Sequence, residues 1–297
     1  MATTTSRKSL AGRSSARLKR RKFVSSAFAF LCLATTIIAL GALTWLLWGI
    51  FSQGTKHLNM TFINSFPSRF AEKAGIKAAL VGSIWVLCIT LATAVPIGVG
   101  AAIYLQEYAP ANKWTQFVQA NIANLAGVPS IVYGILGLAL FVRGLNFERS
   151  VLSGGLTLAL LVLPVIIIAA QEALRGVPSS LRDGSLALGA TKWQTIQRQV
   201  FPVALPGILT GVILAVSRAI GETAPLIMMG ALTYVAFLPT KLTDGFTTLP
   251  IQIFNWTSRP QEEFQKVAAS GIIVLLIVLL TMNALAIFLR HRYNKKV

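Results

Sequence analysis

Charged residues are scarce in this sequence of 297 residues, because they make up 12% of it while hydrophobic residues make up 55%. A soluble domain usually carries about a quarter charged residues. The scarcity therefore excludes an ordinary soluble protein, since most of the surface of this chain does not face water. Aspartate and glutamate are rarer still, at nine against 27 lysines and arginines, which leaves a net charge of +18.

Cysteine and histidine are almost absent, with two residues of each. Cys32 and Cys88 lie within apolar runs, where they are expected to act as small hydrophobes, and His57 and His291 are isolated. The sequence offers no metal-ligand cluster, no Ser/His/Asp arrangement and no Gly-x-x-x-x-Gly-Lys-[Ser/Thr] phosphate loop. These absences argue against a membrane enzyme and predict that the chain holds no metal or cofactor and does not hydrolyse ATP itself.

The excess of positive charge does not predict a nucleic-acid partner, because no folded basic patch with interleaved aromatic residues occurs. Basic residues gather instead at the two ends and between apolar runs, as in membrane proteins oriented by positive charge on the cytoplasmic side. Residues 1–22 are rich in Ser, Thr, Arg and Lys and predict a disordered cytoplasmic tail. Its basic residues are Arg7, Lys8, Arg13, Arg17, Lys19, Arg20, Arg21 and Lys22.

Apolar runs of the ~20 residues needed to cross a bilayer predict the architecture. We expect an all-α polytopic membrane protein with six transmembrane helices. Both termini are expected in the cytoplasm, since the segments then placed inside hold most of the Lys and Arg. Pro96, Gly98 and Gly100 predict a kink or break in the second span. The expected spans cover about residues 23–51, 76–105, 118–142, 152–172, 203–230 and 267–290.

The chain is expected to be organised around one transmembrane core. The core, residues 76–290, contains a cytoplasmic loop at 173–202 and a long outside segment with an amphipathic stretch around Ile251–Phe264. Before it come the tail at 1–22 and a region at 23–75 that holds the first span and an outside loop. A short cytoplasmic tail at 291–297 follows it.

The loop at 173–202 should form a helical hairpin on the cytoplasmic face. Pro178–Ser180 is a helix-start signal with hydroxyl groups suited to capping, and Asp183 suits the positive end of the helix. Gly189–Ala190 permits a tight turn, and Trp193 begins a second helical stretch. The patterns alone leave open whether the hairpin packs on its own membrane domain or docks to a partner. The apolar side of the first helix consists of Leu181, Leu186 and Leu188.

A charged pair lies within the expected fifth span. Arg218 and Glu222 are four residues apart, hence on one helix face, and charges at membrane depth usually pair or line a water-filled path. They either neutralise each other so that the helix can pack, or form an anion path in which Glu222 holds Arg218 and moderates affinity. Snorkelling of Arg218 to the cytoplasm is disfavoured, because it lies about sixteen residues past Pro202. Gly221 and Pro225 make the helix easy to bend.

The loop resembles the cytoplasmic signature of ABC importer permeases, which reads Glu-Ala-Ala, three residues, Gly, nine residues, then Ile-x-Leu-Pro. Here the frame is Asp183–Ser185, Gly189 and Phe201–Pro202, with the spacing intact and Asp, Gly and Ser in place of Glu, Ala and Ala. The resemblance implies that this helix inserts into a cleft of a separate ATP-hydrolysing subunit. The expected coupling residues are Leu181, Asp183, Gly184, Leu186, Gly189 and Ala190.

Two further stretches, Arg218–Leu226 and Asn124–Gly134, closely resemble the phosphate-specific permeases of this ABC class. With Ala187–Thr195 and Ala204–Gly211 the likeness covers residues ~75–290, and the order of motifs is similar to the A-type rather than the C-type permease. The resemblance implies a substrate pathway at Arg218, Glu222 and Thr223. It places helix bending or packing at Pro129, Gly221 and Pro225.

The resemblance implies a type I importer permease in the bacterial inner membrane. Its implied partners are a homologous second permease, two ATP-binding subunits and a periplasmic or extracellular phosphate-binding protein. ATP and magnesium would belong to the ATPase partner. Two alternatives stay open: a permease for another oxyanion such as sulfate or molybdate, and a secondary anion transporter in which Glu222 relays ions.

Overall fold

The computed structural model describes residues 4–231 and 234–294, and within them every regular element is a helix. The chain divides into two compact units, Met1–Ser52 and Gln53–Val297. Five of the described helices are long and apolar enough to cross a membrane, and a strongly bent helix pair could supply a sixth span. The expected all-α polytopic fold is therefore confirmed. A bent helix pair takes the place of the expected third span.

Helix α1 (Thr4–Gly54) makes up the first unit and contains the first expected span. Its large apolar side chains, including Phe23 and Trp45, are exposed, as expected where lipid is the solvent. The helix begins at Thr4, so residues 4–22 are helical where the sequence predicted a disordered tail. The Ala, Leu, Lys and Arg in that segment are strong helix formers, which explains the difference. Residues 1–3 lie outside the described residues.

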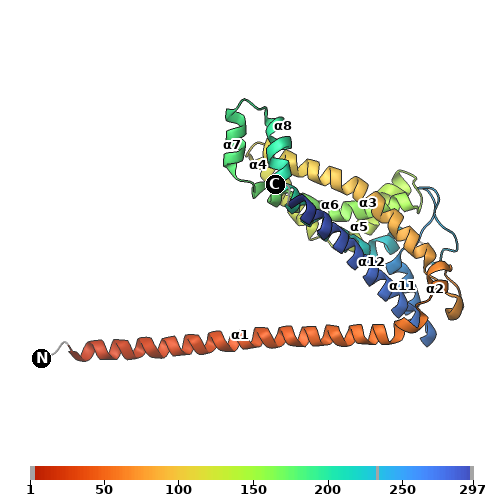
Figure 1. The fold of residues 1–297 in the computed structure, drawn as a ribbon, viewed down its shortest axis with the longest axis horizontal. Coiled ribbons are helices and arrows are strands. Elements are labelled where there is room, and N and C mark those ends of the chain that lie inside the picture. The colour runs from red at the N-terminus through yellow and green to blue at the C-terminus, as the bar shows by residue number, and fades with distance from the viewer. Residues whose placement is uncertain (1–3, 232–233, 295–297) are drawn as a thin grey trace. The chain divides into compact units, whose positions relative to one another are not determined.

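The second unit is a bundle built around α6 (Val151–Arg175), the most deeply buried of the long helices. Helices α3 (Lys77–Ile103), α9 (Phe201–Gly221) and α12 (Glu262–Asn294) complete its frame (Figure 1). Small residues let the backbones approach: a Cβ added at Gly98 would lie 2.7 Å from the Ile166 side chain, and one at Gly207 would lie 2.7 Å from Ala173. Such close approach is the usual basis of helix packing in lipid.

The third expected span is broken. Helix α4 (Lys113–Ala126) and helix α5 (Ser130–Gly137) are bent by 102° at the intervening turn. Pro129 lacks an amide proton, so the helix cannot run through it, and the preceding residue is biased away from helical angles. The sequence predicted one continuous span at 118–142, whereas the structure has a bent helix pair that could serve as one broken span. The sequence predicted a kink or a break near Pro96, and a break is absent, because α3 runs through that residue to Ile103.

The fifth expected span ends earlier than predicted. Its helical segment runs over Lys192–Gly221, and after a break of two residues the short helix α10 (Ala224–Met229) follows. Pro225 explains the break, because a proline disfavours helical geometry before it and belongs in the first turn of a new helix. The predicted helix at 203–230 is therefore two helices.

A helical hairpin of α7 (Ser179–Ala187) and α8 (Lys192–Thr195) lies at one end of the bundle (Figure 1). Gly189 forms the turn between them with a φ of +85°, a conformation that glycine adopts without strain. The hairpin and its glycine turn were predicted correctly. The expected hydroxyl cap is absent, because Pro178 occupies the capping position and no side chain there accepts a hydrogen bond. This end of the bundle is called the hairpin end.

The opposite end of the bundle carries α2 (Met60–Asn64), α11 (Leu249–Thr257) and the loop before α11 (Figure 1). That loop covers the start of α6, because the amides of Val151 and Leu152 donate to the carbonyls of Asp244 and Leu242 at 3.0 and 2.9 Å. The Asp244 carboxylate accepts from the amides of Lys241 and Thr240 at 2.9 and 2.8 Å. These hydrogen bonds hold the pKa of Asp244 below its ordinary value, and the bond from the Lys241 amide has the largest effect.

Replacing Asp244 by alanine should loosen this loop. We expect amide hydrogen exchange at Thr240 and Lys241 to quicken severalfold, whereas the same change at exposed Asp183 on α7 should leave it unaltered. Because the folded pKa lies below the unfolded value of about 3.9, the carboxylate stabilises the loop above that pH and loses the effect as the pH falls through the folded pKa. Unchanged exchange in the variant would show that other contacts order the loop.

Candidate functional site

The charged pair forms at the end of α9. Arg218 lies in the last turn of the helix and Glu222 directly follows it, with Arg218 Nε 3.2 Å from Glu222 Oε1. The Arg218 side chain is 39% exposed and that of Glu222 is 17% exposed. The pairing expected from the spacing of four is present, although the helix ends between the two residues. The guanidinium is not sealed within this chain and keeps donors for a further partner.

The break after α9 brings the other expected pathway and bending residues together. Gly221 ends α9, Glu222 is extended, and Thr223 stands before α10 with its carbonyl accepting the Ile227 amide at 3.1 Å. Thr223 is half-buried next to Glu222. The last turn of α9 and the irregular backbone after it thus present Arg218, Glu222 and Thr223 on one short segment, as broken membrane helices do where backbone lines a cavity or path.

Helix α5 packs directly on α10. A Cβ at Gly134 would lie 2.6 Å from the carbonyl oxygen of Pro225, so only glycine allows this approach. The hydroxyl of Tyr133 donates to the carbonyl of Leu125 at 2.8 Å and spans the bend between α4 and α5. The stretches Asn124–Gly134 and Arg218–Leu226, which are far apart in sequence, therefore form one site.

Replacing Gly134 by alanine should separate α5 from α10. The added methyl group would press on the Pro225 backbone, and overpacking of this kind costs about 1–3 kcal/mol. We expect a lower melting temperature of the purified protein in detergent. Gly100→Ala is the matched control, because a Cβ there meets nothing within 4 Å and alanine favours helix. Equal melting of the two variants would contradict the tight contact.

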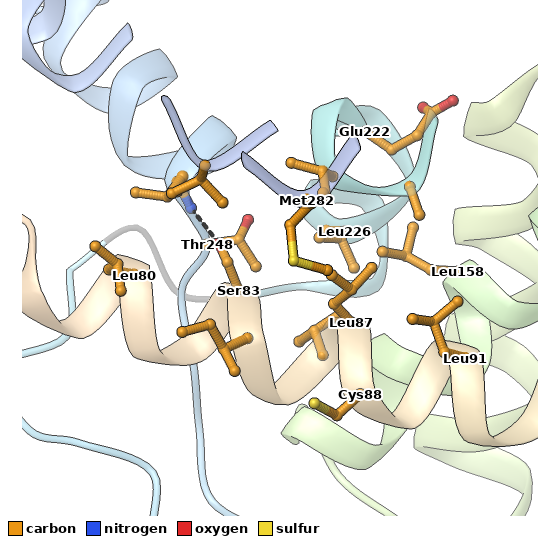
Figure 2. Close-up of a pocket in the computed structure, with 16 residues that line it drawn as sticks. Leu80, Ser83, Leu87, Cys88, Leu91, Leu158, Glu222, Leu226, Thr248 and Met282 are labelled. Carbon is orange, nitrogen blue, oxygen red and sulfur yellow. Dashed lines mark hydrogen bonds between the residues drawn. The ribbon is translucent and has the colours of Figure 1, made fainter. Parts of the chain in front are cut away.

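An apolar cavity of about 320 Å³ lies beside the pair. Figure 2 shows Glu222 at its rim, with the carboxylate directed away from the leucines, while Ser83 and Thr248 lie at the other side. Arg218 does not line this cavity. An anion would find few donors inside it, so the surface suited to an oxyanion is the exposed side of Arg218. The leucines that line the cavity are Leu80, Leu87, Leu91, Leu158, Leu226 and Leu249.

Two polar contacts join α9 to α12, one of them next to the pair and the other about two turns earlier in α9. Ser217 donates to Asn283 Oδ1 at 2.7 Å, and Arg290 donates to the hydroxyl of Thr210 at 3.1 Å. Hydrogen bonds of this kind hold membrane helices together. Sequence reasoning missed them, although a polar residue inside an apolar run, such as Asn283, is the signal that marks such contacts. Among the described residues no cluster of His, Cys, Asp and Glu suited to a metal occurs.

The hairpin exposes the residues expected to couple to a partner. No side chain of α7 is buried, and Leu188 is 90% exposed. Leu181, Gly184 and Ala190 line a shallow groove of about 400 Å³, and Asp183, Leu186 and Gly189 are exposed on the same hairpin. A hairpin packed on its own membrane domain would bury its leucines. The exposed leucines are available to a partner, and docking of the hairpin to a partner stays a prediction.

Comparison with known sequences finds a matching family model and similar permease proteins. The family described as binding-protein-dependent transport system inner membrane component matches residues 94–297. A probable ABC transporter permease protein, YqgI, of Bacillus subtilis (strain 168) is 34% identical over 84% of this chain and 90% of its own length. The phosphate transport system permease protein PstA 1 of Mycobacterium tuberculosis (strain H37Rv) is 33% identical over 91% of this chain and 89% of its own length.

Comparison with solved structures gives the same architecture. A bacterial ABC transporter involved in the import of the acidic polysaccharide alginate matches with a TM-score of 0.66 at 14% identity, over 94% of this chain and 99% of that one. An inward-facing form of the MetNI methionine ABC transporter matches with a TM-score of 0.60 at 18% identity, over 72% of this chain and 96% of that one. At these identities the likeness concerns the fold alone.

Proposed function

Because this chain belongs to the family of binding-protein-dependent transport system inner membrane components, we propose that it is the permease subunit of an ATP-driven importer of inorganic phosphate. Relatives named phosphate transport system permeases, about a third identical over most of the chain, support phosphate over sulfate or molybdate. They also support the A-type permease. The observation that supports the proposal most directly is the position of the Arg218 guanidinium, which lies in an apolar bundle at a helix break.

The exposed side of Arg218 is where phosphate would pass. Its planar guanidinium matches two phosphate oxygens and stays charged at any relevant pH. Glu222 occupies one donor at 3.2 Å and leaves others free to bind an anion, which weakens binding enough for release. Since this chain alone leaves the side chain 39% exposed, a second, homologous permease is expected to complete the path.

The exposed hairpin is where the ATP-hydrolysing subunit would dock. Its exposed leucines and the mixed polar and apolar groove beside them are suited to docking in a cleft of an ATP-binding subunit, of which we expect two in the complete importer. ATP and its magnesium would bind to those subunits, and this chain would carry no cofactor. The hairpin end would then face the cytoplasm together with both termini. The opposite end, with α2 and α11, would receive a phosphate-binding protein from the periplasm or the cell exterior.

Uptake by reconstituted vesicles tests the proposal. The chain, the second permease, the ATPase subunits and the binding protein are assembled in proteoliposomes, and labelled phosphate is followed with and without ATP. We expect accumulation that needs ATP and every partner, persists when ion gradients are collapsed, and resists competition by sulfate and molybdate. Gradient-driven uptake by this chain alone would contradict the proposal and support a secondary transporter. Preferential uptake of sulfate or molybdate would contradict the substrate.

A further inference from the structure

Arg182 of the hairpin is bound by a carboxylate from a distant helix. Its Nη2 lies 2.7 Å from Oε1 of Glu107, and its Nε lies 3.3 Å from Oε2. The Arg182 side chain is 21% exposed and that of Glu107 only 8%. A forked, largely buried pair of this kind has a fixed geometry, unlike the exposed pair Arg175–Glu172, whose side chains are 57% and 60% exposed.

The same arginine also reaches the end of α6. Arg182 Nη1 donates to the carbonyl of Val177 at 2.7 Å, and Nη2 donates to the carbonyl of Leu174 at 2.8 Å. The carbonyl end of a helix attracts cations, so these bonds place the guanidinium where the dipole of α6 favours positive charge. One side chain of α7 thus joins the termini of two transmembrane helices.

A second contact lies next to the first. The Nζ of Lys192, at the start of α8, stands 5.0 Å from the ring centroid of Tyr108. Glu107 and Tyr108 both belong to the π-helical turn Tyr104–Tyr108 that ends α3. Within the hairpin, the hydroxyls of Ser185 and Thr195 are 2.9 Å apart and tie α7 to the segment that leads into α9. The hairpin is therefore attached to the end of α3 through both of its helices.

We propose that Glu107, Tyr108, Arg182 and Lys192 form a clamp that transmits movement of the hairpin to α3 and α6. The proposal rests on the proposed function, because it takes the hairpin as the ATPase docking element. The clamp residues are positioning residues: they do not touch phosphate or ATP. Without the clamp, the hairpin would keep its chain connections to α6 and α9 and the Ser185–Thr195 contact, but it would lose these polar contacts with the end of α3.

The clamp matters because α3 and α6 run from the hairpin end to the site. Leu87 of α3 and Leu158 of α6 line the cavity at whose rim Glu222 lies (Figure 2). A Cβ at Gly98 of α3 would press on Ile166 of α6, so the two helices are tightly packed along their length. Movement of α3 and α6 at the hairpin end is therefore transmitted along these helices to the wall of the cavity beside the Arg218–Glu222 pair.

Removing the charge of Glu107 tests the clamp. In the full importer in proteoliposomes, Glu107→Gln should leave ATPase association and ATP hydrolysis intact but lower the phosphate transported per ATP by about tenfold, because glutamine can still hydrogen-bond Arg182 but lacks the charge that strengthens those bonds. Glu172→Gln is the matched control, because it breaks an exposed pair at the same end of the molecule. The charge exchange Glu107→Arg with Arg182→Glu should recover part of the ratio. An unchanged ratio in Glu107→Gln would overturn the proposal.

A distance measurement on the intact clamp covers the case in which these variants fail to assemble. With Cys32 and Cys88 replaced by serine, spin labels at Ser179 on α7 and at Tyr104, where the π-helical turn after α3 begins, report the separation of hairpin and helix. We expect the same separation before and after ATP binding to the assembled complex, whereas a change would show that the clamp opens and would overturn the proposal. This measurement needs no phosphate. Failure of wild-type phosphate uptake would count against the substrate and leave the clamp to be judged by the distance.

Discussion

Replacing Arg218 by alanine should lower ATP-driven phosphate uptake on the order of 100-fold, because a hydrogen-bonded charge is worth up to about 3 kcal/mol. The variant loses the donors that lie on the exposed side of the helix break and leaves the Glu222 carboxylate, 17% exposed, without its partner. That carboxylate would then repel the anion. The hairpin precedes the start of α9, whereas Arg218 lies in the last turn of that helix, so ATPase association should persist. Normal uptake by Arg218→Ala would remove this residue from the path.

Two companion variants separate anion binding from mere charge neutralisation. Arg218→Lys keeps the charge but loses the planar fork, so uptake should fall by about tenfold rather than vanish. Arg218→Leu combined with Glu222→Leu removes the pair as a unit, which membrane packing tolerates because neither charge is left alone. If the pair only allows the helix to pack, this double variant transports phosphate. We expect it to assemble and to transport none.

Hydropathy and charge spacing predicted most of the bundle. Long apolar runs fix the number of crossing segments because lipid leaves few other structures possible. The four-residue spacing of Arg218 and Glu222 predicted their contact, and Gly189 predicted the hairpin turn. What failed were the positions at which helices break. Pro129 interrupts a span whereas Pro96 does not, and the outcome depends on whether neighbouring helices satisfy the freed backbone groups.

Contacts between distant segments could not be predicted from one sequence. Gly134 against Pro225 depends on how α5 folds back after a 102° bend, which no local pattern encodes. Glu107 and Arg182 are separated by 75 positions. The available signal was the scarcity of acidic residues. Because the 297 residues include only nine of them, a glutamate just beyond an apolar run is unusual. Its partner could not be chosen among 27 basic residues without the fold.

Gly189→Trp should prevent the ATPase subunit from associating with this chain. The residue turns the hairpin at a φ of +85°, and any side chain with a Cβ is strained there by about 1–2 kcal/mol. A Cβ at this position meets nothing within 4 Å, so an indole would project beside exposed Leu188 into the space that the motor subunit is proposed to occupy. Since each ~1.4 kcal/mol is a factor of ten, strain and blockage together should weaken association well over tenfold. Co-purification of the ATPase with the variant measures this.

Gly189→Ala separates strain from bulk, because it carries the same backbone penalty with a single methyl group. Strain alone should weaken association by no more than about 30-fold, and the remaining loss in the tryptophan variant then belongs to the blocked surface. The bundle itself should stay folded in both variants, since the groups that hold the hairpin, Arg182 and Glu107, are untouched. Equal melting temperatures with unequal ATPase binding would therefore place the defect at the interface. A stable, fully coupled complex of Gly189→Trp would show that the motor does not dock here.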